Sequence, residues 1–144
     1  MIKMIHSYWA YIVLIVLIFA IVNAFLGLKA KKKFEAKDLR IALFALIASH
    51  IQLIFGFVAY YLSSFYDTMR AAGMGEVMKN SDLRKVLVEH PLVGIIAITL
   101  ITIGFSKHKK KTTDAAKFKT IAVIYTIALI LILSRIPWDL WFSN

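Results

Sequence analysis

Hydrophobic residues in this chain are gathered into four long runs, which are separated by polar connections. The runs cover about residues 7–28, 41–63, 84–105 and 119–138. Each is about 20 to 23 residues long, and a helix of that length crosses a hydrocarbon core of roughly 30 Å. A helix also pairs its own backbone polar groups, as lipid requires. The pattern therefore predicts an all-α membrane protein, with residues 1–144 forming one four-transmembrane-helix bundle.

Basic residues are concentrated in two of the three connections, which changes the interpretation of the net charge of +10. Residues 29–40 and 106–119 hold six Lys and Arg residues each, hence 12 of the 18 in the chain, but only three of its eight acidic residues. The positive-inside rule places both connections in the cytoplasm and both termini outside. The charge therefore indicates membrane topology and a lipid bilayer as the partner, with no role for nucleic acid. Aromatic residues suited to an outer interfacial belt lie near both ends of the chain: Trp9, Tyr11, Trp138 and Trp141.

The first run could instead be a cleaved signal peptide, with Val22-Asn23-Ala24 as the small-residue site. Its length and the lysines that follow it favour a membrane helix. The absence of cysteine excludes disulfides and thiol catalysis. HExxH, GxSxG and P-loop motifs are also absent, and no catalytic residue is assigned.

The second connection has its own helix signals. Asn80, Ser81 and Asp82 are suitable N-cap residues, so the third helix is expected to begin near Asp82. Pro91 lies within the pattern of this helix and is expected to kink it, because proline has no N–H to donate.

Three of the four histidines lie at or within the apolar runs, where an ionisable side chain suggests a function. They are His6, His50 and His90, whereas His108 lies in a lysine cluster and is expected to be solvated. By helical rise, His50 should lie about 9 Å below His90, and His6 about 9 Å above it. This spread of roughly 18 Å prevents all three from binding one zinc ion. His90 with either His50 or His6 could nevertheless supply the two axial ligands of a haem in a four-helix bundle.

The residues around His90 favour it as the first haem ligand. Small residues follow it at helical spacing, with Gly94, Ala97 and Gly104 around Ile101, and could open a slot for a flat macrocycle. Arg135 should lie at a similar depth and could pair with a haem propionate. His6 is favoured over His50 as the second ligand, because at the outer interface the propionates could reach water.

The same residues also fit structural roles. Small residues on a membrane helix often mean close helix packing. His6 could sit at the interface, and the Glu89-His90 pair could cap a helix. His50, with Ser49 and Gln52 beside it, could form an interhelical hydrogen-bonding cluster. Arg135 could extend to the outer surface. The histidines alone do not decide between these interpretations.

Several motifs along the chain together resemble those of a family of small four-helix membrane proteins of Bacteroidetes that are labelled cytochrome b. The resemblance implies a bacterial inner-membrane protein with haem b at His6, His50 or His90. Helix and histidine placement is also faintly similar to one half of haem A synthase. The acidic residue and histidine arrangement of that enzyme's first outer loop is not found here, so its catalysis is not carried over. The motifs are His6-Ser7, Ser49-His50-Ile51-Gln52 with Gly56, Val88-Glu89-His90, Thr102-Ile103-Gly104 with Ser106-Lys107, Thr112-Thr113-Asp114-Ala115-Ala116-Lys117 and Ser134-Arg135-Ile136-Pro137-Trp138.

The function expected from the sequence is that of a haem b-binding integral membrane protein that serves electron transfer or haem handling. A respiratory or assembly complex is the expected protein partner. The alternative is a non-enzymatic membrane subunit or assembly factor whose histidines are structural.

Overall fold

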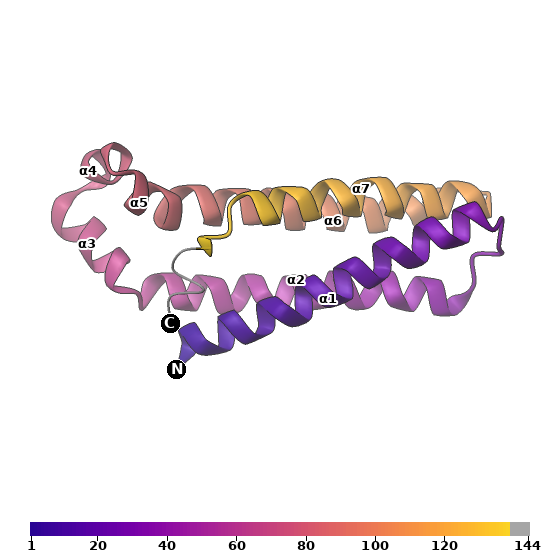
Figure 1. The fold of residues 1–144 in the computed structure, drawn as a ribbon, viewed down its shortest axis with the longest axis horizontal. Coiled ribbons are helices and arrows are strands. Elements are labelled where there is room, and N and C mark those ends of the chain that lie inside the picture. The colour runs from indigo at the N-terminus through magenta and orange to yellow at the C-terminus, as the bar shows by residue number, and fades with distance from the viewer. Residues whose placement is uncertain (139–144) are drawn as a thin grey trace.

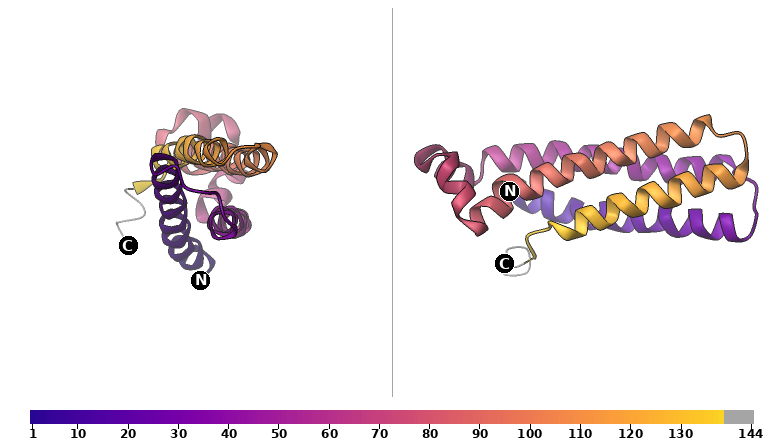
Figure 2. Two further views of the ribbon diagram at one scale, coloured as in Figure 1. Left: turned by 90° about the vertical axis from the view of Figure 1, so that its right-hand side faces the viewer. Right: turned by 90° about the horizontal axis from the view of Figure 1, so that it is seen from above.

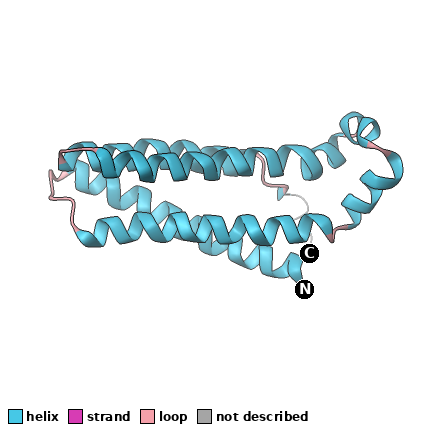
Figure 3. Ribbon diagram, turned by 180° about the vertical axis from the view of Figure 1, so that it is seen from behind, coloured by secondary structure: helices cyan, strands magenta, loops and turns pink. Residues whose placement is uncertain are grey.

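The computed structural model describes residues 1–138, and all regular structure in this range is helical (Figure 3). Four long helices form a bundle: α1 (Ile2–Lys29), α2 (Ala36–Tyr61), α6 (His90–Lys110) and α7 (Asp114–Ser134) (Figure 1). The connection from α2 to α6 contains α3 (Ser64–Ala72), α4 (Met74–Lys79), α5 (Ser81–Arg84) and the π-helical turn η1 (Lys85–Glu89). The third apolar run therefore begins its helical path at Ser81, next to the expected start at Asp82. Trp141, assigned to the aromatic belt, lies outside the described residues.

Four stretches are long and apolar enough to cross a membrane: Ile2–Lys29, Ala36–Tyr61, Ser81–Lys110 and Asp114–Ser134. Many large apolar side chains on them, among them Ile15, Phe19, Phe44 and Ile130, are exposed on the outside of the bundle. Lipid tails solvate such side chains as well as a protein interior does. The prediction of an all-α, multi-pass membrane bundle is confirmed.

The four long helices form a ring in which α1 neighbours α2 and α7, and α6 neighbours α2 and α7. Helices α1 and α6 are thus diagonal to each other, as are α2 and α7 (Figure 2). The N-terminus, the end of α7 and the α3–η1 connection lie at one end of the bundle, here called the terminal end (Figure 1). The two lysine-rich connections lie at the other, here called the basic end.

Small residues let the helices approach closely. A Cβ atom on Gly27 of α1 would lie 2.5 Å from ring carbons of Phe118 on α7, so only glycine fits there. The hydroxyl of Tyr125 on α7 crosses the bundle and donates to the Ala42 carbonyl of α2 at 2.9 Å. Alanines supply much of the remaining buried surface: Ala20, Ala24, Ala45, Ala97, Ala122 and Ala128.

The turn before Pro91 departs from regular α-helix, as expected near a proline. Pro91 has no N–H to donate to the carbonyl of Leu87, four residues earlier. The Tyr60 hydroxyl of α2 donates to that carbonyl at 2.9 Å, and the chain passes through the π-helical turn η1 at this point. The irregular backbone is thereby satisfied from a neighbouring helix, as the membrane environment requires.

Candidate functional site

Two histidines meet across the bundle at the terminal end. His6 lies in the second turn of α1, and His90 is the first residue of α6, the diagonal helix. Their ring centroids are 6.3 Å apart and their planes are inclined by 76°. The fold thus brings together two of the three histidines that the sequence marked as candidate ligands.

The orientation of the His90 ring is set by the end of α7. Its Nδ1 atom lies 3.0 Å from the backbone oxygen of Arg135, the C-cap residue that directly follows α7. A carbonyl oxygen only accepts, so Nδ1 carries the proton and Nε2 keeps its lone pair. Metal-bound histidines are held in this way by an outer hydrogen bond. The Arg135 carbonyl is available because the last carbonyls of a helix have no partner within it.

His6 packs against a face of α2 formed by residues at four-residue spacing. The Trp9 indole donates to the Ala48 carbonyl at 2.9 Å, and the Gln52 amide donates to the His6 carbonyl at 2.9 Å. A Cβ atom on Gly56 would lie 3.3 Å from Cε1 of His6, so glycine makes room for the ring. Nδ1 of His6 and Oε1 of Gln52 are buried without a hydrogen-bond partner within residues 1–138. Buried polar atoms are nearly always paired, so these two require an explanation.

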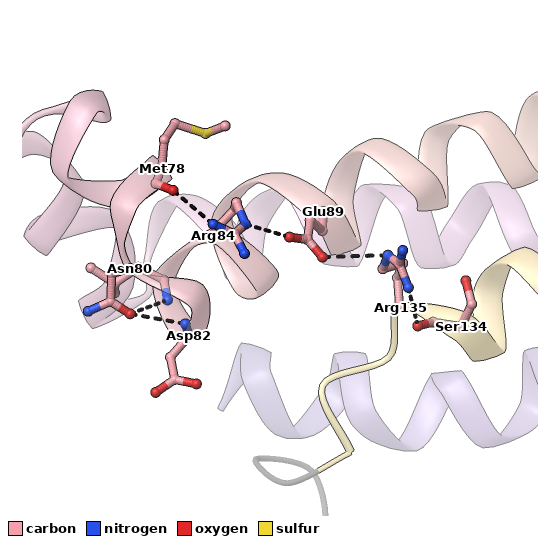
Figure 4. A network of polar contacts seen from close by, with 8 residues as sticks. Met78, Asn80, Asp82, Arg84, Glu89, Ser134 and Arg135 are labelled. Carbon is pink, nitrogen blue, oxygen red and sulfur yellow. Dashed lines mark hydrogen bonds and ion pairs between the residues drawn. The ribbon is translucent and has the colours of Figure 1, made fainter.

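A charged cluster lies beside His90 (Figure 4). The Glu89 carboxylate receives Nε of Arg84 at 2.8 Å and Nε of Arg135 at 3.5 Å. Arg84 also donates to the Met78 carbonyl at 2.9 Å, and Arg135 to the Ser134 carbonyl at 3.0 Å. Arg84, Glu89 and Arg135 together carry one surplus positive charge, and Asp82 adds a further carboxylate to the network that Figure 4 draws.

His50 lies away from this pair. Its Nδ1 bonds to the Leu46 carbonyl at 2.9 Å, and its Nε2 is 3.4 Å from Oγ1 of Thr102. Thr102 is twelve residues beyond His90 on α6, which corresponds to about 18 Å along the axis. The separation of about 9 Å between His50 and His90 that helical rise predicted is therefore smaller than the separation in the structure. That expectation holds only for helices that start level, whereas α2 and α6 are staggered along the bundle.

The structure does not form the expected slot of small residues along the helix below His90. One turn below His90, a Cβ built on Gly94 would meet no neighbouring element of the described chain within 4 Å, so nothing packs closely against this position. Lower on α6, a Cβ on Gly104 would lie 2.8 Å from Ile124 of α7, and Ala97 and Ile101 are fully buried. These lower positions serve helix packing rather than a slot.

His108 is not solvated, contrary to the expectation from its lysine-rich surroundings. Its side chain is only 1% exposed. Its Nδ1 atom makes a hydrogen bond with the Phe105 carbonyl, and the centroid of its ring lies 5.2 Å from that of the Phe34 ring. The connection between α1 and α2 covers this histidine, and proximity to lysines in the sequence could not reveal that.

Gln52 and Gly56 belong to the site, although the sequence pattern did not assign them to it. The signal that could have found them is the four-residue spacing of Ala48, Gln52 and Gly56, which places small or hydrogen-bonding residues on one face of α2. Nothing in the sequence indicated that this face would meet His6.

Residues 1–138 hold no group of three or more His, Asp or Glu side chains that could bind a metal ion. A haem iron needs only two axial ligands from the protein. Comparison of the chain with known protein families, characterised proteins and solved structures gives no match. The function therefore has to be argued from the site itself.

Proposed function

We propose that this protein binds haem b through His6 and His90 and serves electron transfer or haem handling in a bacterial inner membrane. The observation that carries the proposal is the 6.3 Å separation of the two ring centroids across the bundle. Imidazoles bound on opposite sides of one metal ion, at nitrogen–metal distances of about 2.0–2.1 Å, have centroids roughly 6 Å apart. Facing helices of a four-helix bundle commonly supply such ligand pairs.

The surroundings of the two histidines fit a haem. The Arg135 carbonyl holds His90 with Nε2 available as a ligand. Nδ1 of His6 is buried without a hydrogen-bond partner, and no other part of the described chain packs within 4 Å of a Cβ built on Gly94, one turn below His90. When bound, the haem would supply reversible one-electron chemistry, while the chain holds and orients it.

The charged cluster offers a partner for a propionate. Arg84 and Arg135 share the single carboxylate of Glu89, the residue before His90. A buried carboxylate is costly unless it is paired, and an arginine is well suited to pairing with it. Arg84 ends α5 and Arg135 directly follows α7, so both arginines lie at the terminal end of the bundle, where a propionate could also reach water (Figure 1).

The test is the absorption spectrum of the full-length protein purified from cells supplied with haem. We expect a low-spin bis-histidine spectrum that is lost in His6→Ala and in His90→Ala. His50→Ala is the matched control, because the His50 side chain lies about 18 Å from His90 along the bundle. The spectrum of this variant should equal that of the wild type. A colourless wild-type protein, or a spectrum that survives both His6→Ala and His90→Ala, would contradict the proposal.

The second candidate is a membrane subunit or assembly factor whose histidines are structural. It is favoured by the hydrogen bonds of His50 to Leu46 and Thr102, and of His90 to the end of α7. In that case the purified protein is colourless, and His90→Ala lowers the melting temperature because the start of α6 is released from the end of α7.

A further inference from the structure

The basic end of the bundle carries a cavity of about 320 Å³ that is largely open to the surface, far from the two paired histidines. It is bounded by the connection before α2, the last turn of α6 and the first turn of α7. Phe34, Leu39 and His108 form its apolar and aromatic walls, and Glu35, Lys109 and Lys117 supply its charges.

Contacts between distant parts of the chain fix the walls of this cavity. The backbone N–H of Phe34 donates to Oδ1 of Asp114 at 3.0 Å, which ties the first connection to the start of α7. The centroid of the Phe34 ring lies 4.9 Å from the centroid of the Phe118 ring and 5.2 Å from that of the His108 ring. The cavity is therefore a formed feature of this end rather than a gap between loose connections.

Both lysines lie against aromatic rings, Lys117 against the lining residue Phe34 and Lys109 against Phe105, which lies outside the lining. Nζ of Lys109 lies 5.6 Å from the centroid of the Phe105 ring, and Nζ of Lys117 lies 5.6 Å from that of Phe34. Such cation–π contacts restrict two side chains that would otherwise be flexible. Among the lining residues, Lys109 and Lys117 outnumber Glu35, so the lining carries one surplus positive charge, not counting His108. The carboxylates of Asp114 and Asp38 are not part of the lining and accept from the backbone N–H groups of Phe34 and Glu35.

We propose that this cavity binds the phosphodiester headgroup of an anionic phospholipid. A phosphodiester carries one negative charge, which matches the surplus, and ammonium groups bind phosphate oxygens as point charges. The cavity lies where membrane-spanning helices end, so a headgroup reaches it directly, and Phe34 and Leu39 offer apolar surface to the glycerol and upper chain carbons. The proposal does not depend on haem, because the two sites lie at opposite ends of the bundle.

The competing explanation is diffuse attraction of lipid to all the lysines of this end. Lys110 and Lys111 allow the two explanations to be separated, because they lie beside Lys109 but do not line the cavity. Lys109→Gln with Lys117→Gln, and Lys110→Gln with Lys111→Gln, each remove two positive charges from the same end. Diffuse attraction depends on that charge alone, whereas a site depends on which lysines are changed.

The experiment titrates detergent-solubilised full-length protein with phosphatidylglycerol and measures bound lipid by native mass spectrometry. We expect the Lys109/Lys117 variant to lose at least about tenfold more affinity than the Lys110/Lys111 variant. We expect Glu35→Gln to bind more tightly than wild type, a gain that misfolding could not produce. Equal losses in both lysine variants, no bound lipid, or competition by inorganic phosphate or glycerol phosphate at concentrations equal to the lipid would overturn the proposal.

Discussion

At the scale of single residues, polar side chains inside the bundle donate hydrogen bonds to backbone carbonyls of other helices. Trp9, Gln52, Tyr60 and Tyr125 each make such a contact between two helical segments. Without water in the bilayer core, these donors have few alternative partners. Each bond therefore helps to specify which helix faces lie together, in addition to its modest energy.

Tyr125→Phe is expected to lower the free energy of unfolding by roughly 0.6–1.7 kcal/mol, because it removes the donor to the Ala42 carbonyl and retains the ring. Unfolding in mixed micelles by a denaturing detergent measures the difference. Tyr8→Phe is the control, because the Tyr8 side chain is 64% exposed on the outside of α1. Equal stabilities of the two variants would show that the cross-bundle bond contributes nothing.

At the scale of elements, α1 and α7 pack closely because Gly27 faces the Phe118 ring. Phe118 is 1% exposed and is enclosed by Phe34 as well as by α1. The ring therefore has little room to move away from an added methyl group. The same phenylalanine links the packing of two transmembrane helices to the first connection.

Gly27→Ala is expected to destabilise the bundle by about 1–3 kcal/mol, the usual cost of forcing additional atoms into a packed interior. The new Cβ would lie 2.5 Å from Phe118 ring carbons. Thermal unfolding in detergent is a suitable measurement. Gly75→Ala on α4 is the matched control, because a Cβ built there would meet no neighbouring element of the described chain within 4 Å. This variant should be as stable as wild type or slightly more stable, because alanine has the higher helix propensity. A Gly27→Ala protein as stable as wild type would contradict the close-packing argument.

At the scale of the whole molecule, charge is divided between the two ends of the bundle. The basic end holds both lysine-rich connections, and the terminal end holds the mixed-charge connection together with the N-terminus and the end of α7 (Figure 1). The positive-inside rule then predicts that the basic end faces the cytoplasm. If so, His6 and His90 lie toward the outer surface and the proposed lipid site lies at the inner surface.

Single cysteines at Lys33, Met74 and Lys110 test this orientation, and the natural chain has no cysteine to interfere. In intact cells, a membrane-impermeant thiol reagent should label the Met74→Cys variant and leave Lys33→Cys and Lys110→Cys unlabelled. Labelling after cell lysis is the control for reactivity. The reverse pattern would show that the basic end faces outward.

The sequence by itself determined the number of membrane helices, because a run of about 20 apolar residues has no other stable form in lipid. It also located the beginning of the third span near Asp82 and the irregular turn before Pro91, since caps and proline act through local backbone hydrogen bonds. Three candidate ligands could be named because histidine is rare and costly in such runs.

Only the tertiary structure decided which of these residues lie together. The stagger of α2 against α6 separates His50 from His90, and the diagonal placement of α1 and α6 brings His6 to it. Folding of the first connection buries His108. Asp38, in the first turn of α2, is only 3% exposed, and its carboxylate accepts a hydrogen bond from the Asn23 amide of α1 at 2.9 Å. Helix stagger and the covering of one segment by another depend on side-chain packing between distant segments. Local periodicity and charge carry no information about that packing.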